Sequence, residues 1–272
     1  MTREDVGMVN DVADAGERPG GEGRAMSVLS NGIAVLGAFS SEEPELGVTE
    51  IAARVGLHKS TVSRILATLE RENLVERDEP SRRFRLGLGV LALAGPLLAD
   101  LDVRRAAYPV LADLTRRTGE TAALMVWNDT ESICVEQVAS PHQVKHTTPL
   151  GTRYNTAASS SVQVFCAALE ENRVRGLLER GVLHMPGVDE HTVAAYVDRL
   201  GEVRKLGYAV NYGETSLEEA GLAAPVADHR GEQVAAVLLS APRFRVSRDQ
   251  LELYGEVVRE AAAGITARLG GA

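Results

Sequence analysis

Residues 49–69 read TEIAARVGLHKSTVSRILATL and predict two short amphipathic helices separated by a glycine turn. Thr49 is expected to cap the first helix, because its hydroxyl can accept a hydrogen bond from an amide of the first turn. Gly56 is expected to end that helix. The second helix has an apolar stripe at the spacing i, i+3, i+4 and i+7, formed by Val62, Ile65, Leu66 and Leu69. This arrangement predicts a helix-turn-helix.

The polar face of the second helix indicates contact with DNA. It presents small hydroxyls and cations around a slim alanine, which suits a helix that enters the major groove. The residues on this face are Ser60, Ser63, Arg64, Ala67 and Arg71. An amphipathic helix pair that binds no nucleic acid is the alternative interpretation of the same pattern.

A predicted hairpin follows directly and favours the DNA-binding interpretation. Residues 74–76 and 82–86 are expected to form two short strands around a turn at 77–81. Three arginines, Arg82, Arg83 and Arg85, lie in the returning strand, where they could meet phosphates or a minor groove. The pattern is typical of a winged helix-turn-helix.

The distribution of charge separates this region from the rest of the chain. The whole chain of 272 residues has a net charge of −9. Residues 49–87 hold eight Lys and Arg against six Asp and Glu, which gives +2 and leaves −11 elsewhere. A slightly basic module joined to an acidic remainder is typical of a DNA reader with a separate partner domain.

The two cysteines and the hydropathy argue against a zinc protein, a secreted disulfide-rich protein and a membrane protein. Cys134 and Cys166 lie far apart without the spacing of a zinc site, and we expect both to be buried in a reducing compartment. No signal peptide opens the chain, and no apolar run has the length of a membrane span. We therefore expect a cytoplasmic protein.

The remaining chain predicts a polar disordered tail over 1–25, a helix over 27–39 with Leu29, Ile33 and Leu36 on one face, and a charge-free segment over 86–99. That segment suits a linker helix that pairs with a second copy, and a buried core helix is the alternative for the same apolar sequence. Further helices are predicted at 102–118, 162–169, 172–178, 190–205 and 248–269. Strands are predicted at 122–127, 132–138, 143–147, 208–212, 222–226 and 233–240.

After residue 26 the chain resembles IclR-type transcriptional regulators. The resemblance is carried by 56–66 (GLHKSTVSRIL) and 83–87 (RFRLG), and is continued by 105–114, 207–210 and 223–226. It implies an α+β fold with a winged helix-turn-helix at 26–87, a linker helix at 88–101 and a GAF-like effector-binding domain at 102–272. It also implies a homodimer or a dimer of dimers on operator DNA, which we expect to be palindromic. A repressor is one expected role, and an activator is the alternative.

The candidate site residues fall into two sets. The residues expected to contact DNA are Thr49, His58, Lys59, Ser60, Thr61, Ser63, Arg64, Arg82, Arg83 and Arg85. The resemblance implies an effector pocket formed by the backbone amides of Ser160 and Ser161 and by the positions of Asn211, Gly221, Leu238 and Ser240.

The pocket positions depart from the family's common residues. Val162 and Gln163 stand where the family often has Gly-Lys, Asn211 replaces an acidic residue, Gly221 a cysteine and Leu238 a serine. The expected pocket therefore has fewer polar side chains to hold a ligand, which favours an aromatic or apolar acid over a small oxoacid. We expect this acid to bind at the start of a helix without a salt bridge.

Two other functions remain as alternatives. The helix-turn-helix could serve only as a protein-interaction module of a sensory domain. Catalysis would need a nucleophile and a base, but residues 159–161 lack a Gly-x-Ser-x-Gly elbow, so we expect no enzyme and no cofactor. His142 and His146 are four residues apart without a third ligand, and we expect no metal site there.

Overall fold

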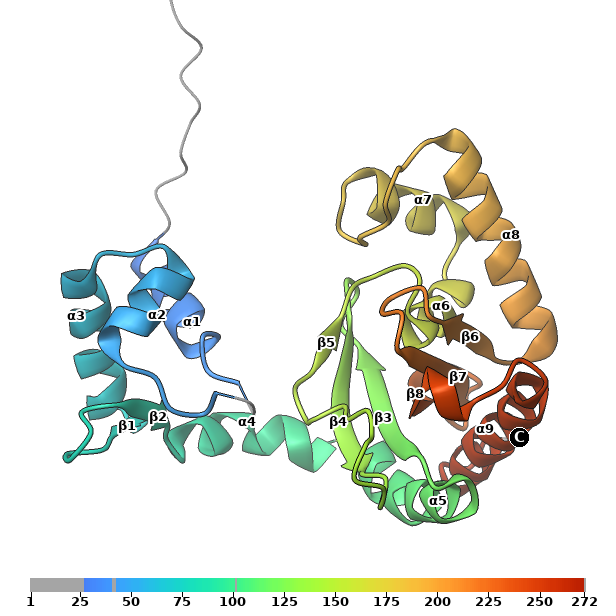
Figure 1. Ribbon diagram of the computed structural model, residues 1–272, viewed down its shortest axis with the longest axis horizontal. Helices are drawn as coiled ribbons and strands as arrows, with labels where there is room; N and C mark the ends of the chain where they lie inside the picture. The colour runs from blue at the N-terminus through green and yellow to red at the C-terminus, as the bar shows by residue number, and fades with distance from the viewer. Residues whose placement is uncertain (1–26, 41–42, 101, 272) are drawn as a thin grey trace, which may run out of the picture. The chain divides into compact units, whose positions relative to one another are not determined.

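The computed structural model describes residues 27–40, 43–100 and 102–271. The chain divides into two compact units, residues 1–93 and 94–272, which are described separately (Figure 1). The tail predicted over 1–25 lies outside the described residues. Among the described residues no helix is long and apolar enough to cross a membrane.

The first unit is a winged helix-turn-helix, as predicted. Its helices are α1 (Val28–Leu36), α2 (Val48–Val55) and α3 (Lys59–Arg71), and its antiparallel hairpin consists of β1 (Val75–Arg77) and β2 (Phe84–Leu86). Gly56 ends α2 with a φ of +67°, a left-handed conformation that glycine adopts without a steric penalty. The core collects the fully buried Val35, Ile51, Val62 and Leu66, so the predicted apolar stripe of α3 is confirmed.

Two local predictions for this unit are wrong. Gly47, not Thr49, is the N-cap of α2, and the Glu50 carboxylate accepts the Gly47 amide at 2.7 Å. The Glu50 carboxylate thus reaches back from the first turn to the amide of the N-cap residue, as the third helical residue of a capping box does. In α1 the buried residue is Val35, and Leu36 is partly buried against the core, whereas Leu29 and Ile33 are 73% and 62% exposed, so most of the predicted apolar face points outward.

Helix α4 (Gly89–Asp100) follows the hairpin closely. A Cβ on Gly87 or Gly89 would lie 2.3 Å or 2.6 Å from the Asn73 carbonyl oxygen, so only glycine permits this approach. In the described first half of α4, Leu91 and Leu93 are 60% and 71% exposed. The charge-free segment is therefore a helix that presents leucines to the surface.

The second unit is built on one six-stranded antiparallel sheet with the order β5-β4-β3-β8-β7-β6. Antiparallel pairing lets strands that are neighbours in sequence, such as β7 and β8, pair through short turns. The strands are β3 (Thr121–Trp127), β4 (Ser132–Val138), β5 (Arg153–Tyr154), β6 (Ala209–Tyr212), β7 (Glu219–Ala227) and β8 (Gln233–Pro242).

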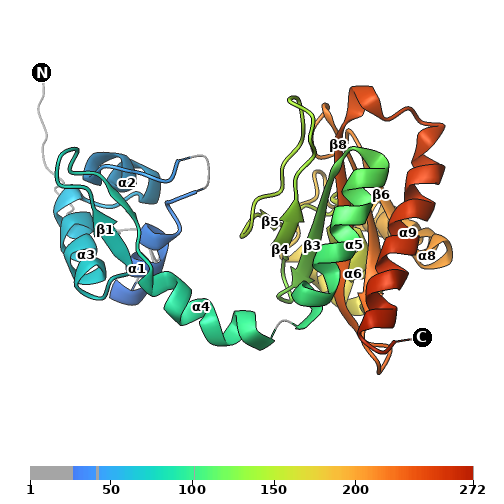
Figure 2. The ribbon, with the colours of Figure 1, turned by 90° about the horizontal axis from the view of Figure 1, so that it is seen from below.

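Helices cover both faces of this sheet (Figure 2). On one face lie α5 (Asp102–Thr118) and α9 (Gln250–Arg268); on the other lies α6 (Ser160–Ala167), with α7 (Glu171–Glu179) and α8 (Glu190–Leu206). Each face has its own apolar core because successive strand residues point to opposite sides. The α+β architecture is as predicted.

The predicted strand over 143–147 is wrong. Side chains bond to the backbone within this segment and just after it: Thr121 Oγ1 donates to the His146 carbonyl at 2.6 Å, and Gln137 Oε1 accepts the amide of Thr148. These bonds replace the ladder that a strand would make, and β5 pairs with β4 in its place.

Candidate DNA-binding face and effector cavity

The exposed side of α3 carries most of the predicted DNA contacts. His58, Lys59, Ser60, Ser63 and Arg64 are exposed, and Thr61 is half-buried beside α1. Thr49 is exposed near the start of α2. Val62 and Leu66 anchor the opposite side of α3 in the core, so the polar side is fixed toward solvent. This geometry allows α3 to enter a major groove.

The cations of this unit differ in whether a carboxylate already holds them. Within the described residues Lys59, Arg64 and Arg82 form no ion pair. Arg83 instead donates to Glu50 at 2.7 Å and to the Glu45 carbonyl at 2.9 Å. These bonds tie the hairpin to α2.

The three hairpin arginines that were predicted to contact DNA have three different roles. Arg85 pairs with Glu76 on the opposite strand at 2.9 Å, and Arg83 fastens the hairpin to α2. Arg82 lies at the turn with a φ of +57°. The same turn is closed by the Asp78 carboxylate, and hydrogen bonds from Ser81 lower the pKa of Asp78. Of these three arginines, Arg82 is thus the one that is available to a phosphate.

In the second unit the predicted effector residues do come together. Asn211, Gly221 and Ser240 stand side by side in register on β6, β7 and β8, on the face covered by α6. Ser160 at the start of α6 faces this row: a Cβ on Gly221 would lie 3.2 Å from Ser160 Oγ. Leu238 lies on the same face of β8. The glycine allows α6 to approach the sheet closely.

This group is closely packed and polar. Ser160, Ser161 and Asn211 are 2%, 0% and 3% exposed. The amides of Ser160 and Ser161 have no acceptor among the described residues, as expected in the first turn of a helix. Ser240 Oγ is also buried without a partner. Unpaired buried donors of this kind suit an electron-rich ligand atom.

A cavity of about 420 Å³ lies next to this group rather than within it. It borders Ala157 and Ala158, immediately before α6. Asn211 connects it to the polar row, because its Oδ1 accepts the amides of Glu214 and Thr215 at 3.0 Å and 3.3 Å. The lining residues are Thr156, Ala157, Ala158, His184, Met185, Pro186, Tyr196, Arg199, Glu214 and Thr215.

The wall of this cavity contains a cation, Arg199, which the sequence analysis did not single out. Its guanidinium pairs with both oxygens of Glu214, at 2.9 Å and 2.7 Å. It also donates to Gln163 Oε1 at 2.8 Å and to the Val210 carbonyl at 2.6 Å. Arg199 is far from these partners in sequence, and no spacing pattern of α8 singles it out.

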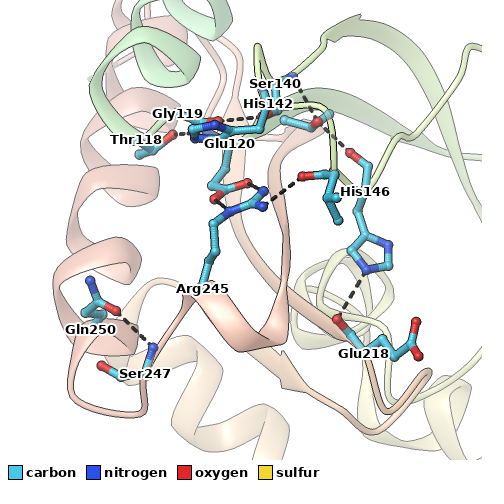
Figure 3. A network of polar contacts seen from close by, with 12 residues as sticks. Thr118, Gly119, Glu120, Ser140, His142, His146, Glu218, Arg245, Ser247 and Gln250 are labelled. Carbon is cyan, nitrogen blue, oxygen red and sulfur yellow. Dashed lines mark hydrogen bonds and ion pairs between the residues drawn. The ribbon is translucent and has the colours of Figure 1, made fainter.

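The two histidines weighed as metal ligands belong to a different network (Figure 3). His146 Nε2 lies 3.2 Å from the Glu218 carbonyl, whereas the His142 ring lies beside Gly119. The centre of the network is Glu120, which is 3% exposed and held by Arg245 at 2.7 Å and 2.8 Å. The histidines thus serve separate contacts.

The two cysteines are buried, as predicted. Burial raises the pKa of each thiol, Cys134 and Cys166, to about 12. Both therefore remain neutral thiols near neutral pH and lack the thiolate that metal binding or nucleophilic attack requires.

Comparison with known proteins agrees with both halves of this geometry. Residues 28–79 match the IclR helix-turn-helix domain, and residues 96–267 match the C-terminal domain of the bacterial transcriptional regulator IclR. The chain is 28% identical to the transcriptional repressor IclR of Escherichia coli K12, over 89% of this chain and 90% of that protein.

Solved structures show the same likeness. A targeted domain of an IclR-family regulator shares 61% identity over 62% of this chain and 98% of that one, with a TM-score of 0.62. An IclR homologue from Microbacterium hydrocarbonoxydans, complexed with 4-hydroxybenzoate, shares the fold at 24% identity, over 89% of this chain and 99% of that one, with a TM-score of 0.74. This chain belongs to the IclR family and is a ligand-responsive, DNA-binding transcriptional regulator.

Proposed function

We propose that this regulator binds a palindromic operator as a homodimer or a dimer of dimers in the cytoplasm, and that it represses a metabolic operon until an effector binds. The observation that carries the proposal is the exposed side of α3, where Lys59 and Arg64 form no ion pair with any described residue and lie beside small hydroxyl side chains. DNA phosphates and base edges would supply the partners that these cations lack.

The DNA contacts divide by role. Ser60, Ser63 and Arg64 read base edges from α3, and His58, Lys59 and Arg82 bind the backbone. Thr49 approaches the same backbone from α2. Arg83 and Arg85 position the hairpin through their ion pairs with Glu50 and Glu76, rather than through contact with DNA.

Assembly is proposed to run through α4, in the linker segment 88–101 between a DNA-binding domain at 26–87 and an effector domain at 102–272. Leu91 and Leu93 are exposed in the part of α4 before Asp100 that contains no charged residue, and exposed leucines of this kind are commonly covered by a partner. A second copy would supply the same surface, which is the arrangement of a two-fold dimer.

The effector is proposed to bind in the cavity beside α6. A volume of about 420 Å³ accommodates a molecule with one aromatic ring. Ala157, Ala158, Met185 and Pro186 give the cavity apolar walls. The polar group of Ser160, Ser161, Asn211, Gly221 and Ser240, with Leu238 on the same face, lies next to the cavity and is connected to it through Asn211. These features favour an acid with an apolar or aromatic body.

A footprinting experiment on the DNA upstream of the protein's own gene tests the proposal. We expect the full-length protein to protect a palindrome with half-sites one or more helical turns apart, and to ignore shuffled DNA of the same composition. Equal binding of the two DNAs, or no binding at low salt, would contradict operator recognition. It would favour a helix-turn-helix that only contacts other proteins.

A further inference from the structure

One ion pair stands at the edge of the effector cavity. Arg199 from α8 and Glu214 from the loop between β6 and β7 both line the cavity. The carboxylate meets the guanidinium through both oxygens, at 2.9 Å and 2.7 Å. Carboxylates that bind arginine prefer this two-pronged geometry. The place that a ligand carboxylate would take on Arg199 is thus already filled by a carboxylate of the chain itself.

The guanidinium keeps its position without Glu214. Its Nε donates to Gln163 Oε1 at 2.8 Å, and Nη2 donates to the Val210 carbonyl at 2.6 Å. Gln163 is held in turn, because its Nε2 donates to the Ala158 carbonyl at 2.7 Å. These partners come from α6, from β6 and from the loop before α6, and all of them are uncharged. Arg199 is therefore fixed in place by uncharged groups, and Glu214 is its one charged partner among the described residues.

Glu214 can leave at little cost. Its side chain is 42% exposed and that of Arg199 is 36% exposed, and an ion pair so close to water contributes little net stability. The backbone of the loop is held independently by Asn211, which accepts the amides of Glu214 and Thr215. Only the side chain has to rotate for the carboxylate to leave the cavity.

We propose that Glu214 is a displaceable internal carboxylate, and that the effector is a monocarboxylate which replaces it on Arg199. The inference rests on the proposed function, because it gives the cavity an effector. It replaces the expectation of a ligand held without a salt bridge. The same exchange explains how Arg199 can reject anions from bulk solvent, since every such anion must compete with the tethered carboxylate of Glu214.

The test measures calorimetric binding of benzoate and its neutral analogue benzamide to the full-length protein and to Glu214→Gln. The amide keeps the shape of the side chain but not its charge. We expect Glu214→Gln to bind benzoate roughly fivefold tighter, the upper range for one half-exposed ion pair. Benzamide should bind the two proteins equally. Glu202→Gln is the control, because it removes a carboxylate that pairs with Lys205 on the solvent side of the same helix.

The proposal is overturned if Glu214→Gln binds benzoate no tighter than the parent. It is equally overturned if benzamide gains as much as benzoate, or if neither protein binds any carboxylate at millimolar concentration.

The regulator function can fail separately from this exchange. If the protein binds its upstream DNA specifically and only uncharged compounds release it, then the exchange is refuted and the regulator stands. If Glu214→Gln behaves as expected but no DNA is bound specifically, then the exchange stands and operator binding is refuted.

Discussion

The DNA-binding face and the effector cavity each present an arginine to a partner, but under opposite conditions. Arg64 on α3 is exposed and forms no ion pair among the described residues. Arg199 on α8 is fixed by Gln163 and Val210 and already holds Glu214. DNA is a large polyanion whose bases and phosphates supply many contacts at once, so an open cation suffices. A small ligand makes few contacts, so its cation has to be positioned in advance and shielded from competing anions.

The largest expected effect tests whether these two regions are independent units. Leu66 is fully buried in the winged helix-turn-helix, so Leu66→Ala should lower that unit's unfolding free energy by about 2–5 kcal/mol. Trp127, the chain's one tryptophan, lies in β3 of the other unit. In denaturant titrations the circular dichroism should show an earlier transition, whereas the Trp127 fluorescence transition should not move.

Leu239→Ala is the matched control, because Leu239 is equally buried in the second unit. It should shift the Trp127 transition and leave the first unit unchanged. A common shift of both transitions in either variant would mean that the two regions unfold as one, and that the comparison drawn between them does not hold.

The next effect concerns assembly, which would couple two DNA-binding faces. Leu91 is 60% exposed on α4, so Leu91→Glu should leave the fold intact but disrupt pairing of two copies. We expect a smaller particle by light scattering and weaker binding to the two half-sites. Leu217→Glu, at a leucine that is 79% exposed in the second unit, should change neither. Unchanged mass and affinity in Leu91→Glu would refute the role of α4.

The smallest effect separates two arginines of the hairpin. Arg82 is free for a phosphate, so Arg82→Ala should reduce the slope of log affinity against log salt by about one. Arg83 is engaged with Glu50 and Glu45, so Arg83→Ala should loosen the hairpin and lower the stability of this unit more than the salt slope. Equal changes of the salt slope in both variants would show that the ion pair with Glu50 opens on DNA.

The sequence predicts those parts of the fold that depend on local patterns. Gly56 ends α2, the stripe of Val62 and Leu66 is buried, and β4 spans the predicted 132–138, because periodicity and glycine act within a few residues. The missed features depend on distant partners. The side chains of Thr121 and Gln137 bind the His146 carbonyl and the Thr148 amide, and no local pattern predicts these contacts.

The candidate sites follow the same division. The polar side of α3 can be predicted from the periodicity of its sequence. The proximity of Ser160, Asn211 and Ser240 could be expected only from the family resemblance. Arg199 could not be found in this way, because its role comes from three elements that meet it only in the fold. The exposed Leu29 and Ile33 of α1 show the converse, since an apolar stripe by itself does not say what covers it.

The most direct test of the central claim measures the binding of full-length protein and Arg64→Ala to the protein's own upstream DNA, to single-base variants of it and to shuffled DNA, by fluorescence anisotropy. If α3 reads the operator, Arg64→Ala should lose roughly 1–3 kcal/mol on the operator and should no longer discriminate at one base position, with little change on shuffled DNA. If Arg64→Ala binds the operator, its variants and shuffled DNA as the parent does, then α3 is not the recognition helix.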